Sequence, residues 1–318
     1  MKSISAIIPV YNSQGSLAGV VERLANVLAG LTNHFEIILV DDCSRDSSWQ
    51  VVQELAASHS QVRGIHLMRN YGQHNALLCG IRAARCELCV TLDDDGQNPP
   101  EEIPNMVAKL EQGFEVVYGT PQKQQHGLWR DAASVITKLV LTNMMGAETA
   151  RSTSAFRLFY TRCREAFANF QGPYVSIDVL LTWGCSRFTA VPVKHLERTI
   201  GKSNYTFRKL VRHAITLLTG FSVLPLQIAS FAGFVSVIFG LLILVYVVIR
   251  YIIQGGVVPG FSFLASTIAV FSGVQLFALG MIGEYLARMH FRIMDKPSYA
   301  IADTTPTSQP DINEPTTG

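Results

Sequence analysis

The sequence has few charged residues and, over a long C-terminal stretch, no acidic ones. Charged residues make up 16% of the 318 positions, against about 25% in an average soluble domain. Positions 198–283 contain no Asp or Glu, and positions 251–283 contain no charged residue at all. Water does not solvate such a stretch, which argues against a wholly soluble protein and against disorder over most of the chain. The net charge of +2 is too small to indicate a nucleic-acid partner.

Cysteine is absent from the apolar stretch. All six cysteines precede it, and the pair Cys86-x-x-Cys89 has no second pair at the spacing of a zinc site. We therefore predict that the cysteines are reduced, partly buried thiols of a cytoplasmic domain.

Two apolar runs are long enough to cross a membrane. Leu224 to Ile249 gives 26 residues without a charge, and Phe261 to Gly283 gives another 23. A spanning helix needs about 20 apolar residues, whereas two buried helices of a large soluble core are the structural alternative. The Gly- and Pro-containing sequence of residues 254–260 predicts a short turn between the runs.

Cations flank this hairpin on its outer sides. Lys202, Arg208, Lys209 and Arg212 precede the first run, and Arg288, Arg292 and Lys296 follow the second. The positive-inside rule then places both termini, and with them roughly the first 200 residues, in the cytoplasm. The N-terminus has too short an apolar run for a signal peptide. The sequence thus predicts a multi-pass protein of the inner or plasma membrane.

A basic amphipathic segment precedes the first run. Apolar residues recur at helical spacing from Phe207 to Phe221, with Arg208, Lys209 and Arg212 on the other side. This pattern is typical of a helix in the membrane interface, although a helix packed on a soluble domain would show it too. The Pro- and Thr-rich tail after Tyr299 predicts disorder. The predicted organisation is a cytoplasmic domain (1–205), an interfacial helix (206–222), a two-span hairpin (223–289) and a partly disordered cytoplasmic tail (290–318).

The first half of the chain alternates apolar runs of strand length with helical segments. Strands are predicted at ISAIIPVY, FEIILV, VRGIHLM and CELCVTL, and helices over Leu17–Leu31, Ser48–Ser58 and 75–84. This alternation favours an α/β fold with a parallel sheet. Ligands of such sheets bind beyond the carboxyl ends of the strands. Tyr11, Asp41, Asp42 and Asp93–Asp95 follow strands and should share that crevice.

The carboxylates at the strand ends need compensation, because like charges this close repel. A divalent ion with oxygen ligands that also binds substrate phosphates would supply it. If the chain is extended here, Asp93 and Asp95 point the same way and Asp94 points away, while Gln97 adds an amide oxygen. A solvated turn is the alternative, because Asp-Gly-Gln-Asn-Pro-Pro is good turn sequence.

These motifs resemble glycosyltransferase family 2, specifically the polyprenyl-phosphate glycosyltransferases. The resemblance runs from about Ile4 to Tyr299 through IIPVYN, VDDCSRDSS, LMRNYGQHNALLCGI, TLDDDGQNPPEEIP, HLERTIGKSNYTFRKL and GEYLARM. Members include undecaprenyl-phosphate glucosyltransferases, dolichyl-phosphate mannose synthases and an aminoarabinose transferase of lipid A modification. The resemblance implies a GT-A fold, Rossmann-like, and a nucleotide-sugar donor.

The resemblance also implies roles for individual residues. Pro9, Tyr11 and Asp42 lie where such enzymes hold the base and ribose, with Asp41 close by. Asp93 lies near the sugar and diphosphate, and Asp95 with Gln97 matches a metal-binding Asp-x-Gln for Mg²⁺ or Mn²⁺. The segment implied to handle phosphates at the membrane contains Arg198, Lys202, Ser203 and Tyr205, and Arg130 and Arg157 are further candidates for the acceptor phosphate.

Three positions depart from the family pattern. Ser13 and Gln14 replace an acidic residue, Cys43 replaces a glycine, and the Asp that commonly precedes the Phe-Arg segment is missing from residues 151–157. That last departure puts a carboxylate contact to the sugar or acceptor in doubt.

The chemistry favours direct displacement at the anomeric carbon. The acceptor phosphate is already largely dianionic near neutral pH, so a strong general base is unnecessary. Arg198, Lys202 and Arg130 would bring two anionic reactants together, and inversion would give a β-linked product from an α-linked donor. UDP-glucose is the expected donor, with GDP-mannose and UDP-aminoarabinose as alternatives.

Other classes of protein remain open. A membrane-anchored scaffold with a degenerate transferase domain would explain the missing Asp. A processive polysaccharide synthase would need a Gln-x-x-Arg-Trp motif, which the sequence lacks. A transporter would need ionisable residues in mid-membrane. Nothing in the sequence decides whether the protein is a homo-oligomer.

Overall fold

The computed structural model describes residues 2–121, 153–172, 175–194, 224–254, 260–294 and 296–306. The chain divides into two compact units. The first comprises Met1–Leu210 with Asp295–Gly318, and the second comprises Val211–Met294. The predicted interfacial helix over residues 206–222 lies outside the described residues.

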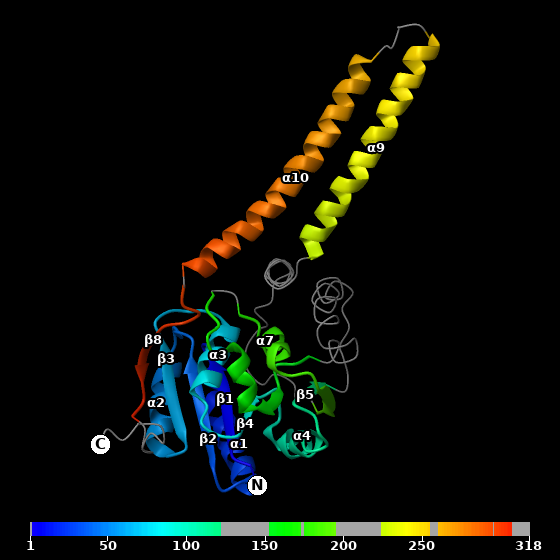
Figure 1. Ribbon diagram of the computed structural model, residues 1–318. Coiled ribbons are helices and arrows are strands. Elements are labelled where there is room, and N and C mark those ends of the chain that lie inside the picture. The colour runs from blue at the N-terminus through cyan, green and yellow to red at the C-terminus, as the bar shows by residue number, and fades with distance from the viewer. Residues whose placement is uncertain are drawn as a thin grey trace, which may run out of the picture. The chain divides into compact units, whose positions relative to one another are not determined.

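The first unit is built on a mixed sheet (Figure 1). Its strands are β1 (Ile4–Val10), β2 (Phe35–Asp41), β3 (Val62–Leu67), β4 (Leu88–Thr91), β5 (Val116–Pro121), β6 (Arg157–Tyr160), β7 (Phe188–Val193) and β8 (Ile301–Thr304). They lie in the order β7-β5-β6-β4-β1-β2-β3-β8. Strands β1 to β4 pair in parallel, as predicted. Strands β6 and β8 are antiparallel to their neighbours, so the sheet is not wholly parallel.

Helices connect the strands. They are α1 (Leu17–Leu31), α2 (Ser48–Ser58), α3 (Gln73–Ala83), α4 (Ile103–Leu110) and α7 (Ile177–Gly184), with short 3₁₀ segments η1 (Pro100–Glu102) and η2 (Thr161–Phe167). The bounds of α1 and α2 are those predicted from the spacing of apolar residues, and α3 begins two residues earlier than predicted.

Both faces of the central strands are covered. In β1, Ile4, Ala6, Ile8 and Val10 belong to the core cluster that also contains the apolar face of α1, as the alternation of side chains along a strand requires. Ile7 faces α3 instead, where a Cβ added to Gly80 would lie 2.4 Å from Ile7 Cγ2. Glycine at position 80 thus lets α3 lie directly on the sheet.

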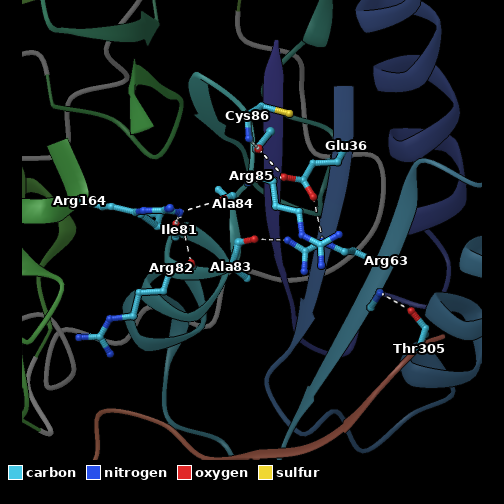
Figure 2. Close-up of polar contacts among 12 residues, drawn as sticks. Glu36, Arg63, Ile81, Arg82, Ala83, Ala84, Arg85, Cys86, Arg164 and Thr305 are labelled. Atoms are coloured by element: carbon cyan, nitrogen blue, oxygen red, sulfur yellow. Dashed lines mark hydrogen bonds and ion pairs between the residues drawn. The ribbon is translucent and has the colours of Figure 1, made fainter. Parts of the chain in front are cut away.

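Two arginines bind the C-terminal end of α3 (Figure 2). Arg164 donates to the carbonyls of Ile81 and Arg82 at 3.2 Å each and to that of Ala84. Arg63 donates to the carbonyl of Ala83 and forms an ion pair with Glu36 at 2.9 Å. The last carbonyls of a helix lack partners within the helix and carry partial negative charge, so these cations stabilise α3.

The prediction of disorder after Tyr299 is wrong for residues 300–306. Strand β8 pairs antiparallel with β3 and covers that edge of the sheet (Figure 1). Ser298 and Thr305 are buried on either side of it. The composition failed as a signal here because β8 is stabilised by backbone pairing with β3, while its own four residues stay exposed.

The second unit contains two long helices, α9 (Leu224–Gln254) and α10 (Phe261–Ile293), which pack against each other. Within the described residues one helix is long and apolar enough to cross a membrane, at Leu226–Arg250 with a mean hydropathy of 2.8. In α10 the apolar part, Phe271–Ala287, is shorter than a full span. The first predicted span is therefore supported by length and composition, and the second is not established.

Cys163 in η2 and Cys185, which follows α7, lie next to each other with their Cα atoms 6.3 Å apart, which is within the range of a disulfide. The reduced state of the cysteines stays a prediction. Cys43, Cys79, Cys86 and Cys89 are free.

Candidate active site

The loops after β1, β2 and β4 are joined to one another by hydrogen bonds. Asp94 accepts from the backbone N–H of Tyr11 at 3.1 Å and from the Ser13 hydroxyl. The backbone N–H of Asn12 donates to Ser44 Oγ at 3.0 Å, which links the loop after β1 to the loop after β2. The structure thus brings the polar residues at these strand ends together at one edge of the sheet.

Asp94 has a structural role that the sequence did not suggest. Strand β4 ends at Thr91 and a turn begins at Asp94, so the premise of an extended chain over residues 93–95 does not hold. Burial raises the pKa of Asp94, and the bonds from Ser13 and Tyr11 partly offset that effect.

Asp41 and Asp42 bind different neighbours, although they are adjacent. Asp41 is buried and accepts from Ser44 and from His66 Nδ1, the latter at 2.7 Å. Asp42 accepts from the backbone N–H groups of Tyr71 and Gly72, both at 2.7 Å. Burial raises the pKa of Asp42 to about 6, although those two N–H groups favour the charged form.

The nucleotide-binding candidates of the first strand differ in exposure. Pro9 is buried within β1, where it pairs with Val40, whereas Tyr11 is 39% exposed at the end of the strand. Tyr11 is therefore available to a base or ribose, and Pro9 shapes the strand beneath it.

Asp93 is held by two side-chain amides. Gln73 Nε2 donates to Asp93 Oδ1 at 2.7 Å, and Asn98 Nδ2 donates to Oδ2 at 3.3 Å. Burial is the main reason that the pKa of Asp93 is raised to about 6, and the negative charges of Asp95 and Asp94 add to it. This carboxylate lies in a region of excess negative charge.

Asp95 and Gln97 lie in one turn. The Gln97 backbone N–H donates to Asp95 Oδ1 at 3.1 Å, and Gly96 between them has φ +73, which favours glycine. Among the described residues, no group of three or more His, Cys, Asp or Glu side chains could hold a metal ion. A carboxylate and an amide oxygen nevertheless fit an Mg²⁺ or Mn²⁺ that completes its shell with phosphate and water oxygens.

Arg157 is a buried core residue, which argues against its predicted role at the acceptor phosphate. It is 4% exposed, and its Nε and Nη2 donate to the two carboxylate oxygens of Asp178 at 2.7 and 2.9 Å. Its Nη1 donates to the carbonyl of Ala155 at 3.1 Å. Burial alone would lower the pKa of Arg157, but Asp178 raises it above its ordinary value. The guanidinium is thus already bound by protein groups.

The other predicted phosphate-binding residues lie outside the described residues. They are Arg130, Arg198, Lys202, Ser203 and Tyr205.

Sequence reasoning missed Gln73 and Asp178, and it placed Asp94 in the crevice without giving it a role. Gln73 lies in the motif LMRNYGQHNALLCGI, which suggested the family but gave no role to this residue. Asp178 lies in α7, 21 positions after Arg157, and no spacing rule connects the two.

Comparisons with known proteins find related sequences over most of the chain. The family model described as Glycosyl transferase family 2 matches residues 5–171. An undecaprenyl-phosphate 4-deoxy-4-formamido-L-arabinose transferase of Shewanella sediminis is 36% identical over 310 residues, 94% of this chain and 92% of that protein. The protein of the same name from Photorhabdus laumondii is 33% identical over 304 residues, 95% of this chain and 94% of the relative.

Solved structures resemble the fold more distantly. Glucosyl-3-phosphoglycerate synthase of Mycobacterium tuberculosis, crystallised with Mn²⁺, uridine diphosphate and phosphoglyceric acid, has a TM-score of 0.51 and 16% identity. The match covers 69% of this chain and 76% of that one. At this identity the likeness concerns the fold alone.

Proposed function

The chain belongs to glycosyl transferase family 2, and from that premise we propose that it transfers a 4-amino-4-deoxy-arabinose type of sugar, in its formamido form, from a UDP donor to undecaprenyl phosphate. The observation that carries this proposal is that relatives with this name match the chain over nearly its whole length. UDP-glucose, the donor expected from the sequence, has no comparable support. We therefore prefer the UDP-aminoarabinose type of donor, which the sequence had suggested as an alternative.

The strand-end loops supply a donor site for this reaction. Tyr11 and Asp42 would bind the base and ribose, and Asp93 would orient the sugar. A divalent cation bound through Asp95 and Gln97 would supply positive charge against the charge that develops on the diphosphate leaving group. These residues come from three adjacent parallel strands, which is where an α/β sheet binds its ligands.

The lipid phosphate is its own nucleophile. Its second pKa is about 6, so near neutral pH it attacks the anomeric carbon without a protein base and inverts that centre. Arg198 and Lys202, with Arg130, would hold this phosphate against the donor. Arg198 and Lys202 lie in the sequence shortly before the predicted interfacial helix and α9, and we propose that they act at the cytoplasmic face of the membrane, with both termini on that side.

The test is a donor panel. Purified protein in detergent would be incubated with a short-chain polyprenyl phosphate, Mg²⁺ or Mn²⁺, and labelled UDP-4-deoxy-4-formamido-L-arabinose, UDP-glucose or GDP-mannose. Lipid-soluble label from the first donor alone is expected. Label from UDP-glucose alone would overturn the choice of sugar and keep the reaction class. Binding of UDP without label from any donor would support a scaffold protein.

A further inference from the structure

One short turn holds both carboxylates that the proposed donor site depends on. Tyr71 and Gly72 donate their backbone N–H groups to Asp42, and the next residue, Gln73, donates its side-chain amide to Asp93, all at 2.7 Å. The position of residues 71–73 therefore determines where the ends of β2 and β4 present their carboxylates.

The turn has no side-chain cap. Gly72 is the N-cap of α3, with φ +97 and no side-chain hydrogen bond to cap the helix. The first N–H groups of a helix have no partners within the helix and depend on other acceptors. At Gly72 that acceptor is the Asp42 carboxylate, so contacts from outside the turn help to fix its position.

One such contact comes from the segment that follows α10, residues 298–305, which we call the return segment. Asn75 is 5% exposed, and its Nδ2 donates to the carbonyl of Ser298 at 2.5 Å. Asn75 is also joined to the turn itself, because its backbone N–H donates to the carbonyl of Gly72 at 3.0 Å. Asn75 thus connects the turn to the return segment through two bonds.

The return segment has independent anchors. Ser298 is 2% exposed, and its hydroxyl donates to the carbonyl of Gly172 at 2.8 Å. The Met68 N–H donates to the carbonyl of Ala300 at 2.9 Å, and β8 pairs with β3. At the far end, Gly64 donates its N–H to Thr305 Oγ1 at 2.8 Å. The Ser298 carbonyl is therefore a fixed point against which Asn75 can hold the turn.

We propose that Asn75 is a positioning residue that binds the return segment at Ser298 and thereby fixes the 71–73 turn, with the Asp42 and Asp93 carboxylates, for the nucleotide sugar. The role deepens the proposed function and rests on it for its effect on turnover. Because Asn75 is buried and its amide is occupied by Ser298, it acts through the turn and not on the substrate. The return segment then fixes the 71–73 turn in addition to covering the edge of the sheet at β3.

The experiment compares Asn75→Ala and the similarly shaped Asn75→Leu with Thr305→Val. Leucine keeps the branched shape of the side chain and has no donor, and Thr305→Val removes a bond at the other end of the return segment. Loss of one buried hydrogen bond weakens the restraint by roughly tenfold. We expect both Asn75 variants to raise the KM for the nucleotide sugar by about five- to tenfold, with a smaller change in kcat and no such change in Thr305→Val.

Amide hydrogen exchange gives a readout that does not need activity. In both Asn75 variants the Tyr71 and Gly72 amides should exchange several-fold faster while β1 keeps its protection, whereas Thr305→Val should speed exchange near Gly64 only. Equal loss of protection throughout the domain, or wild-type exchange at Tyr71 and Gly72 in Asn75→Leu, would overturn the proposal.

Two further measurements distinguish a failure of the Asn75 proposal from a misfolded variant and from a failure of the proposed function. If Asn75→Ala does not fold, Ser298→Ala replaces it, because loss of the bond to Gly172 loosens the same carbonyl and should raise exchange at the same two amides. If the wild-type protein transfers no sugar in the donor panel, the proposed function fails while the exchange data still decide the role of Asn75.

Discussion

Replacing Asp178 with asparagine should strongly destabilise the first unit, which comprises Met1–Leu210 and Asp295–Gly318. The change keeps the shape of the side chain but removes the negative charge that binds both Nε and Nη2 of Arg157. It also disturbs the partner of the buried Tyr118 hydroxyl, which donates to Asp178 at 3.1 Å. The guanidinium then stays buried with neutral acceptors alone, which are the new amide oxygen at position 178, the Ala155 carbonyl and the Thr91 hydroxyl.

The size of the effect follows from burial. Removing one partner of a buried ion pair costs about 3–5 kcal/mol, because the other charge is left without compensation. In a unit of this size each kcal/mol corresponds to about 2–4 °C in Tm. The expected fall in Tm is therefore about 6–20 °C, measured by thermal unfolding of the purified protein.

A matched triple variant separates charge from packing. Arg157→Met with Asp178→Leu replaces the pair by apolar side chains, and Tyr118→Phe removes the hydroxyl that would lose its acceptor. Apolar replacements of a buried ion pair are often neutral or stabilising. The triple variant should recover most of the lost Tm. A Tm in Asp178→Asn within about 2 °C of the wild type would refute the inference that the pair is buried and bonded as described.

The Arg157–Asp178 ion pair also predicts how the stability of the folded state depends on pH. Burial alone would raise the pKa of Asp178, but Arg157 holds it below its usual value. Its stabilising contribution is therefore present above the unfolded-state pKa of about 4 and is lost as the pH falls through the lower folded-state pKa.

Four further predictions concern the site and its support. Asp95→Asn should lower kcat by about a hundredfold or more at saturating Mg²⁺ with an unchanged Tm, and full activity in excess chelator would contradict the metal assignment. Lys202→Ala should slow transfer to the lipid phosphate by about tenfold to a hundredfold, and a parallel collapse of UDP affinity would instead place Lys202 at the donor diphosphate. Arg164→Ala should lower the free energy of unfolding by about 1–3 kcal/mol, and a wild-type denaturant midpoint would show that the end of α3 does not depend on it. Because the pKa of Asp42 is raised to about 6, UDP affinity should fall as the pH drops from about 7.5 to about 5 and should lose that dependence in Asp42→Asn. The contribution of Asp42 to stability has the opposite sign, because the folded state takes up the proton first and gains stability between about pH 6 and about pH 4.

The spacing of apolar residues predicted those helices and strands whose formation depends on residues close together in the sequence. The apolar spacing of α1 and α2 and the buried runs of β1 to β4 identified those elements, and the rule for strand ends placed Tyr11, Asp42 and residues 93–95 together. Strands β6 and β8 were missed because each is defined by pairing with a strand distant in sequence. In β8, Thr304 pairs with Ile65 across more than 200 positions, and no period in a four-residue strand reveals that contact.

The site explains why sequence reasoning found the carboxylates but not the residues that hold them. The donors described for Asp42, Asp93 and Asp94 are all neutral: backbone N–H groups, two side-chain amides and a hydroxyl. Neutral donors fix the carboxylates in place without cancelling their charge. The buried cation Arg157 is already paired with Asp178. Burial is the main reason that the pKa values of Asp42 and Asp93 are both raised to about 6, and the negative charge of neighbouring aspartates adds to it. An arginine or lysine beside these carboxylates would cancel their charge. Without such a partner the carboxylates keep a negative site, which suits a divalent cation that binds together with the nucleotide sugar.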